Sequence, residues 1–235
     1  MLNTAWPVSI VFSISICFST KAAPLSLREF NDLASECAPW VAPSTLAAIA
    51  TVESNFDPLA AHDNTTGETL HWKDPAEATQ SVKERLKARH SLDVGLMQIN
   101  SNNFSLLGLT PDKAFQPCFS LSAAGHLLES RYAGGNTTAA EQLALRQAIS
   151  AYNTGDLTRG FANGYVRKVE LAARKMVPPL LELPEKDGEK AIRQDAWDVW
   201  GSHERHRSAV DSSSSPTQQR PKVGESTDDN QLIFD

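Results

Sequence analysis

The feature that most constrains the fold is a succession of apolar helical repeats between residues 25 and 177, interrupted by glycine, proline and asparagine. Apolar residues recur at the spacing of helices that bury one face. Few stretches alternate apolar and polar residues as strands do. Helices are expected over residues 27–34, 43–57, 76–90, 121–132, 141–152 and 165–176. The sequence therefore predicts a mainly α domain.

Turn residues mark two places where the helical pattern ends. Asn, Asp and Gly surround the short run Thr69–Trp72 and favour a small β-hairpin. Gly155 directly follows an expected helix, in the position that a C-cap glycine takes.

The first 23 residues have the pattern of a secretory signal peptide. The apolar run from Val8 to Phe18 is too short to span a bilayer, and the small residues Ala22 and Ala23 follow it. No Lys or Arg precedes the run, so an uncleaved anchor is the alternative. Cleavage would leave a folded domain over residues 24–176, exported to the periplasm.

The composition changes after residue 176. Pro178, Pro179 and Pro184 are expected to end any helix, and residues 177–235 contain 12 acidic and 7 basic residues. A polar segment of this kind buries too little apolar surface to offset its ordering entropy, so a mostly disordered tail is expected. Within it, Trp197 and Trp200 suggest a docking patch for another protein. Tryptophans that fold back onto the domain are the alternative.

Two cysteines remain once the signal peptide, with Cys17, is removed. Cys37 and Cys118 are expected to form a disulfide in an oxidising compartment, with two free buried thiols as the alternative. Their spacing does not match a zinc site, and no phosphate-binding loop is evident. The histidines His62, His71 and His90 are irregularly spaced in a polar loop and are expected to be exposed. No metal or other cofactor is therefore expected.

The net charge of −6 argues against a nucleic-acid-binding protein, because such proteins usually carry a basic stripe. It also argues against simple charge attraction to an anionic polymer such as a cell-wall glycan.

Glu53 is the first candidate for chemistry. It follows Ile49 and Ala50 by one helical turn and so lies on the apolar side of its helix. Burial there would raise its pKa, which suits a general acid. A solvated acid at a helix end is the alternative.

Three further segments supply neutral hydrogen-bonding groups. DVGLMQINS (93–101) contains the amides Gln98 and Asn100, AYNTG (151–155) contains Tyr152 and Asn153, and GYVRKVE (164–170) contains Tyr165. Amides and phenols around one protonated acid would suit a neutral, hydroxyl-rich and acetamide-rich polymer.

These residues carry a resemblance to a known family. Glu53-Ser54, Gly95-Leu96-Met97-Gln98, Ala151-Tyr152-Asn153 and Tyr165 stand in the order of the motifs of Slt-type lytic transglycosylases, over roughly residues 40–175. The family implies a mostly helical fold similar to goose-type lysozyme. The segment SLDVGLMQINS, the small size and the acidic tail resemble more closely the VirB1-type members. These members serve bacterial type IV secretion systems in conjugation and in DNA or effector export.

The resemblance implies a mechanism and a set of roles. Protonated Glu53 would cleave the bond between N-acetylmuramic acid and N-acetylglucosamine, and a 1,6-anhydro product would form without water. Ser54, Gln98 and Asn153 would orient the sugar, while Tyr165 would hold Glu53. Met97 and Tyr152 would form the wall of the site, with packing alone as the alternative.

Asp93 leaves a second mechanism open. It stands two residues before Gly95, like the Asp of c-type lysozymes, so a muramidase could use Glu53, Asp93 and water. A structural role for Asp93 in a turn or cap is the simpler alternative. A third alternative is a non-catalytic glycan-binding scaffold.

The expected partners follow from the same resemblance. Peptidoglycan strands would be the substrate, and the tail would dock on subunits of the secretion system. The junction before Pro178 would be open to proteolysis, which would release a tail fragment.

Overall fold

The computed structural model describes residues 23–181, with side chains described as far as Met176. Apart from Ala23, the expected signal peptide lies outside the described residues, as do the Trp pair and most of the expected tail. The helices are α1 (Leu27–Cys37), α2 (Pro43–Glu53), α3 (Pro75–Lys87), α4 (Pro111–Ala114), α5 (Pro117–Arg131), α6 (Thr138–Thr154), α7 (Arg159–Ala162) and α8 (Tyr165–Leu181), with a 3-10 turn η1 (Ser101–Asn103). The strands are β1 (Ala60–Asp63), β2 (Glu68–His71), β3 (Leu92–Val94) and β4 (Ile99–Asn100). The predicted mainly α fold is confirmed.

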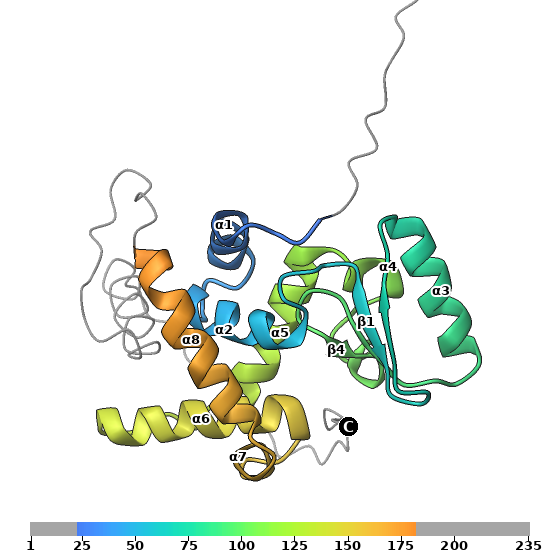
Figure 1. The fold of residues 1–235 in the computed structure, drawn as a ribbon. Helices are drawn as coiled ribbons and strands as arrows, with labels where there is room; N and C mark the ends of the chain where they lie inside the picture. The colour runs from blue at the N-terminus through green and yellow to red at the C-terminus, as the bar shows by residue number, and fades with distance from the viewer. Residues whose placement is uncertain (1–22, 182–235) are drawn as a thin grey trace, which may run out of the picture.

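Most of the helices lie on one side of the domain, and the sheet lies on the other (Figure 1). Helices α2 and α8 pack against each other, with α1 and α5 on one side and α6 and α7 near the start of α8. The sheet lies with α3 and α4 on the other side of α5 (Figure 1). Among the described residues, no helix combines the length and the apolar character that a membrane crossing requires.

Helix α2 forms the centre of the helical part. Pro43 stands in its first turn, where the missing N–H has no intrahelical partner to lose. Leu46, Ile49 and Ala50 are fully buried. The helix ends at Glu53, earlier than the expected end at Asp57-Pro58, because Asn55 and Phe56 both adopt left-handed conformations, with φ of 51° and 65°. Glu53 is thereby the last helical residue.

Helix α8 crosses α2 and continues to Leu181. The expectation that Pro178 and Pro179 would end the helix is wrong. Proline lacks the N–H that would bond to the preceding turn, but its fixed φ is compatible with a helix, so the two residues remove bonds without ending the element.

The sheet has four antiparallel strands in the order β2-β1-β3-β4. The predicted hairpin is confirmed as β1 and β2, with Gly67 in its turn at a φ of 76°. Strands β3 and β4 were not predicted. They pair Asp93 with Asn100 and Val94 with Ile99, so the segment DVGLMQINS is itself a tight hairpin.

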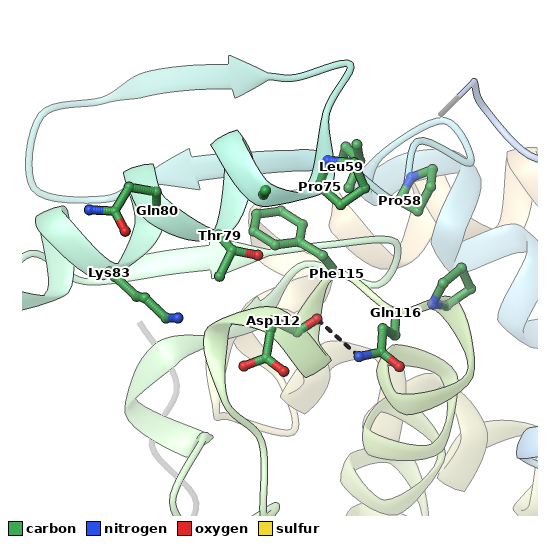
Figure 2. Close-up of a pocket in the computed structure, with 11 residues that line it drawn as sticks. Pro58, Leu59, Pro75, Thr79, Gln80, Lys83, Asp112, Phe115 and Gln116 are labelled. Atoms are coloured by element: carbon green, nitrogen blue, oxygen red, sulfur yellow. Dashed lines mark hydrogen bonds between the residues drawn. The ribbon is translucent and has the colours of Figure 1, made fainter. Parts of the chain in front are cut away.

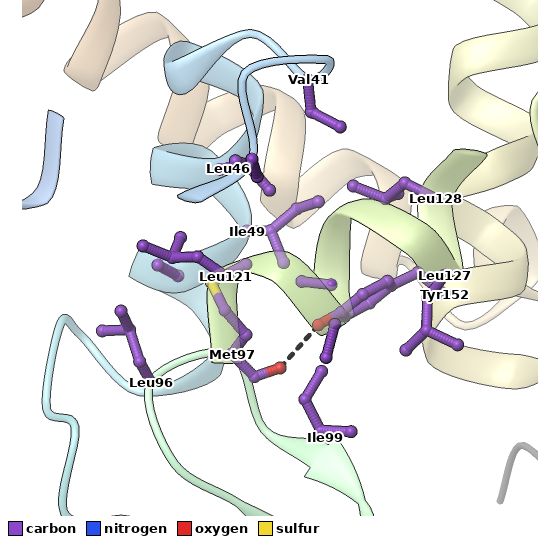
Figure 3. Close-up of a cluster of buried hydrophobic side chains, with 14 of the residues drawn as sticks. Val41, Leu46, Ile49, Leu96, Met97, Ile99, Leu121, Leu127, Leu128 and Tyr152 are labelled. Carbon is purple, nitrogen blue, oxygen red and sulfur yellow. Dashed lines mark hydrogen bonds between the residues drawn. The ribbon is translucent and has the colours of Figure 1, made fainter. Parts of the chain in front are cut away.

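The core packs under this second hairpin (Figure 3). Leu96, Met97 and Ile99 are buried together with Leu46 and Ile49 of α2 and with residues of α5 and α6. Gly95 has a φ of 82°, and a Cβ atom there would lie 2.0 Å from the carbonyl oxygen of Ala114. Only glycine therefore fits at the entrance to the turn.

A disulfide joins Cys37, at the end of α1, to Cys118, in the first turn of α5. The pairing is the one expected for the exported chain. It closes a sequence separation of 81 residues, which contains α2 and the whole sheet.

Candidate active site

A cavity of about 270 Å³ lies between the end of α2, the sheet and the end of α6. Its lining combines one acid from a helix, one acid from a strand, and several amides. The lining residues are Glu53, His62, Asn64, Asp93, Gln98, Asn100, Asn103, Leu127, Tyr152 and Asn153. Of the residues predicted from the sequence, Glu53, Asp93, Gln98, Tyr152 and Asn153 thus meet in one cavity.

Glu53 is half-buried at the end of α2 and accepts a hydrogen bond on Oε1 from the hydroxyl of Tyr165. Burial raises the pKa of Glu53 to about 7, the hydrogen bond from Tyr165 opposes this rise, and the charge of Asp93 adds to it. Lys168 has a smaller lowering effect on the same pKa. A glutamate with this pKa is substantially protonated near neutral pH and can donate a proton.

Tyr165 is held at the first residue of α8. Its backbone N–H donates to Oδ1 of Asn163 over 2.9 Å, and Gly164 precedes it with a φ of 81°. Burial and the nearby charge of Glu53 raise the pKa of Tyr165 well above its usual value. The phenol therefore keeps its proton and acts as a donor to Glu53.

Gln98 lies in the turn between β3 and β4 with a φ of 47°. Its side-chain Nε2 donates to the carbonyl oxygens of Gly95, at 2.8 Å, and Ala60, at 3.2 Å. One amide hydrogen therefore ties the turn to β1, and the other closes the turn on Gly95. The Oε1 atom is the group that Gln98 offers to a ligand, and it can only accept a hydrogen bond.

Asn153 stands two residues before Gly155, which is confirmed as the predicted C-cap and has a φ of 70°. The Oδ1 atom of Asn153 accepts a hydrogen bond from Nδ2 of Asn163 over 3.1 Å. This contact links the end of α6 to the segment that precedes Tyr165.

Asp93 is held by two amides. Nδ2 of Asn100 donates to Oδ1 of Asp93 over 2.9 Å, and Nδ2 of Asn64 donates to Oδ2 over 3.1 Å. Both carboxylate oxygens thus have protein donors. Asp93 contributes a fixed negative charge that faces the same cavity as Glu53.

Ser54 and Met97 are not among the lining residues of this cavity. The hydroxyl of Ser54 donates to the carbonyl oxygen of Leu96 over 2.7 Å. Met97 is fully buried in the core, and its carbonyl oxygen accepts a hydrogen bond from the hydroxyl of Tyr152 at 2.6 Å (Figure 3). Both residues fix the position of the turn, and Tyr152 combines this structural bond with a place in the cavity wall.

Sequence reasoning did not assign His62, Asn64, Asn103 or Leu127 to the site. The expectation that all three loop histidines are exposed is wrong for His62, which is half-buried on β1 and lines the cavity. The buried neighbours Ala61 and Asp63 show the strand alternation that turns His62 to the opposite face. Recognising β1 over residues 60–63 would have found it.

The expectation is also wrong for His90. Its Nδ1 atom pairs with Oδ2 of the fully buried Asp63 at 2.7 Å, and Nη1 of Arg85 contacts the same oxygen at 2.6 Å. Burial acts to raise the pKa of Asp63, but hydrogen bonds from His90, Arg85 and two backbone N–H groups hold it well below its usual range. His71 is exposed as expected.

A larger cavity of about 630 Å³ lies between α3 and the segment that joins α4 to α5 (Figure 2). Its lining is mostly apolar and includes Pro58, Leu59, Pro75 and Phe115, with Lys83 and Asp112 as charged groups. Glu53 and the amides gather in the smaller cavity, so the smaller cavity is the candidate active site. Within residues 23–176, no group of three His, Cys, Asp or Glu side chains is arranged to hold a metal ion.

Comparisons with known proteins identify a family and several relatives. Residues 33–174 match the family model described as "Transglycosylase SLT domain". The chain is 68% identical over 205 residues to protein virB1 of Agrobacterium fabrum, which covers 87% of this chain and 84% of the relative. It is 59% identical to protein virB1 of Rhizobium radiobacter over 100% of this chain and 99% of the relative.

A more distant relative is the type IV secretion system protein virB1 of Brucella abortus. The identity is 35% over 165 residues, which covers 66% of this chain and 68% of the relative. No solved structure matches.

Proposed function

Since the chain belongs to the SLT transglycosylase family and is a peptidoglycan lytic transglycosylase, we propose that Glu53 performs both proton transfers of its reaction. The observation that carries this proposal is the half-buried Glu53, held by Tyr165 and with a pKa raised to about 7. Such a group can act first as an acid and then as a base.

In the first step, Glu53 donates its proton to the glycosidic oxygen between N-acetylmuramic acid and N-acetylglucosamine. The bond from the anomeric carbon to that oxygen breaks, and the leaving sugar departs with a new hydroxyl. The carbonyl oxygen of the 2-acetamido group stabilises the positive charge at the anomeric carbon, as in substrate-assisted glycosidases. Gln98 supports this step by accepting a hydrogen bond from the substrate on Oε1, because both of its amide hydrogens are already bonded to the backbone.

In the second step, the carboxylate of Glu53 removes the proton from the C6 hydroxyl of the muramic acid. The C6 oxygen attacks the anomeric carbon and closes a 1,6-anhydro ring. Glu53 regains its proton, and no water is consumed. The phenol of Tyr165 stabilises the carboxylate between the two steps by its hydrogen bond.

The muramidase alternative with Asp93 is not favoured by the family to which the chain belongs. Both oxygens of Asp93 already accept hydrogen bonds from Asn100 and Asn64, which supports an electrostatic role. The experiment that tests the proposal is mass spectrometry of the muropeptides released from isolated sacculi. Anhydro ends are one water lighter than reducing ends, and predominantly reducing ends would refute the transglycosylase mechanism.

A Glu53→Gln variant tests the role of the acid. Turnover should fall by about 10²–10⁴-fold, the usual contribution of a general acid or base. The control is Glu129→Gln, which removes the same charge from an exposed position on α5. Full activity of Glu53→Gln would exclude Glu53 as the acid.

The biological role follows from the relatives. The chain acts in type IV secretion, like the virB1 proteins that it matches, by opening the peptidoglycan locally. We propose that residues 1–23 direct export to the periplasm and that the tail docks on secretion-system subunits through Trp197 and Trp200. A chain ending at Leu181 should then keep its turnover on isolated sacculi and lose its support of secretion. Unchanged secretion would remove the role of the tail.

A further inference from the structure

His62 lies in the wall of the active-site cavity, and the proposed reaction gives it no role. It stands on β1, directly opposite Thr69 of β2 on one side and Asp93 of β3 on the other. Residues that stand opposite each other on neighbouring strands have their side chains on the same face of the sheet. The imidazole ring therefore belongs to a row of three side chains, and His62 and Asp93 of this row both line the cavity.

The hydrogen bond on one side of the ring determines what the other side offers. Nδ1 of His62 lies 3.2 Å from Oγ1 of Thr69, and within residues 23–176 the ring has no second hydrogen-bond partner. If the hydroxyl of Thr69 donates to Nδ1, the ring hydrogen is on Nε2. The negative charge of Asp93 on the next strand favours this arrangement, because it attracts the positive end of an N–H bond. His62 then offers a donor to a ligand in the cavity.

The other cavity groups offer mainly acceptors. Gln98 has used both amide hydrogens and presents Oε1, and Tyr152 has given its hydroxyl hydrogen to a backbone carbonyl. Asn153 can donate through Nδ2, but it lies on the side of α6. On the side of the sheet, Asn64 donates to the carboxylate of Asp93, whereas the ring N–H of His62 has no acceptor within the described residues.

A dedicated donor matters most for a carbonyl oxygen of the substrate. A hydroxyl both donates and accepts, so it can bond to any of the cavity groups, whereas a carbonyl oxygen only accepts. The two sugars beside the cleaved bond each carry an acetamido carbonyl. In the proposed reaction, the carbonyl of the muramic acid faces its own anomeric carbon. The carbonyl of the N-acetylglucosamine remains, and it needs a donor from the protein.

We propose that Nε2–H of His62 donates to the acetamido carbonyl oxygen of the N-acetylglucosamine beside the cleaved bond. This inference rests on the proposed function, since it takes that glycan as the substrate. Removal of the acetyl group replaces the carbonyl by an ammonium group, which donates and cannot accept. A strand with glucosamine at this position leaves the N–H of His62 without an acceptor. His62 is therefore a specificity-determining residue that selects N-acetylated strands and takes no part in the proton transfers.

The test compares two kinds of sacculi. One kind is untreated, and in the other the N-acetylglucosamine has been deacetylated enzymatically while the muramic acid keeps its acetamido group. The value of kcat/KM for muropeptide release is measured on both with the full chain, and their ratio is taken for each protein sample. An unfolded fraction in a variant lowers both values equally, so the ratio does not depend on it.

Three variants are compared with the wild type. His62→Phe keeps an aromatic ring and removes both nitrogens, while His62→Gln keeps an amide donor at a similar reach. The control is His126→Phe on α5, outside the cavity. The side chain of His126 is 57% exposed and stacks on Trp40 with 4.8 Å between the ring centres, a contact that phenylalanine can keep.

The wild type and His126→Phe should share one ratio, with untreated sacculi cleaved faster. In His62→Phe this ratio should fall about tenfold, the effect of one lost hydrogen bond to the substrate, through slower cleavage of untreated sacculi. His62→Gln should restore most of the ratio. An unchanged ratio in His62→Phe would overturn the proposal, because an equal loss on both substrates indicates a structural role in the hairpin. A wild type that does not distinguish the two kinds of sacculi would overturn it as well.

The proposed function is tested separately by the products of the wild type on untreated sacculi. Absence of anhydro ends there would refute the transglycosylase mechanism, whereas a changed ratio concerns His62 alone.

Discussion

Tyr165 donates a hydrogen bond to Glu53 across 112 residues of sequence, from the first residue of α8 to the last residue of α2. The phenol lowers the pKa of the carboxyl, while burial and Asp93 raise it. The protonation of Glu53 near neutral pH therefore depends on its burial at the end of α2, on Tyr165 of α8 and on Asp93 of β3. Each contribution can be altered separately.

Tyr165→Phe should raise the pKa of Glu53 further, because it removes the hydrogen bond that favours the carboxylate. The activity should therefore persist to higher pH, while the maximum turnover falls because the carboxyl is less firmly held. The measurement is the pH profile of anhydro-muropeptide release.

Tyr152→Phe is the matched control for this profile. It removes the hydrogen bond to Met97 and should cost about 1 kcal/mol of stability. Its hydroxyl donates to Met97 and not to Glu53, so the alkaline limb of the profile should stay in place. An identical shift in both variants would contradict the assigned role of Tyr165.

Asp93→Asn should shift the alkaline limb in the opposite direction. Removing a like charge favours the ionised form of Glu53, so its pKa falls and the acid form is lost at lower pH. The products should remain anhydro, and turnover should fall less than the roughly 10²–10⁴-fold expected for Glu53→Gln. A switch in product type, or a loss as large as that of Glu53→Gln, would instead support two-carboxylate chemistry.

Glu53→Gln should also stabilise the protein at alkaline pH. The folded-state pKa of Glu53 is about 7, above the usual value of 4.5, so the folded state holds this proton longer than the unfolded state. The free energy of unfolding therefore decreases as pH rises between these two values. Allowing for the partial exposure of Glu53, the variant should gain about 1–2 kcal/mol at pH 8 and little at pH 4. Urea unfolding at both pH values measures this difference.

Asp63→Asn should destabilise the sheet, because it leaves Arg85 and His90 without their buried partner. Breaking a buried pair costs about 3–5 kcal/mol. The pKa of Asp63 is lowered, so its contribution is present above the ordinary aspartate pKa and is lost as pH falls below it. The difference between variant and wild type in urea should therefore shrink in acid.

Glu68→Gln provides the comparison for Asp63→Asn. Glu68 pairs with the same Arg85, but its side chain is 53% exposed, so the loss should stay below about 1 kcal/mol. Equal losses in the two variants would show that burial does not determine how much these ion pairs contribute to the free energy of unfolding.

Reduction of the disulfide should destabilise the domain substantially. Cys37 and Cys118 close a long loop, and the chain-entropy relation gives about 4.5 kcal/mol for a loop of this length. Thermal unfolding of Cys37→Ser/Cys118→Ser should match that of the reduced wild type. A reducing agent should leave the double variant unchanged, and a wild type equally insensitive to reduction would contradict a stabilising bond.

The helices and the acid could be predicted because their signals are local. Apolar spacing around Ile49 placed Glu53 on the buried side of its helix, and Gly155 marked the end of α6. Strands β3 and β4 have only three and two residues, too few to show alternation. Strand β3 also pairs with β1, about thirty residues earlier in the chain, and local sequence does not show this contact.

The polar clusters were harder to predict for the same reason. Asp63, Arg85 and His90 meet only after the hairpin packs on α3, and nothing local identifies them as partners. The net charge also conceals the four exposed cations Arg167, Lys168, Arg174 and Lys175 of α8, because a sum over the chain does not show where charges of one sign gather. The argument from net charge against attraction to an anionic polymer therefore does not extend to this one surface.

Helix α8 separates two kinds of evolutionary change. Its inner side packs against α2 and carries Tyr165, so substitutions there alter folding and catalysis together. Apart from Lys168, whose charge influences Glu53, its outer side has no such role, so the charges of Arg167, Arg174 and Lys175 can be exchanged one at a time while the core and Glu53 stay as they are. Charge changes can therefore accumulate on this single helical surface while the geometry of the active site is conserved.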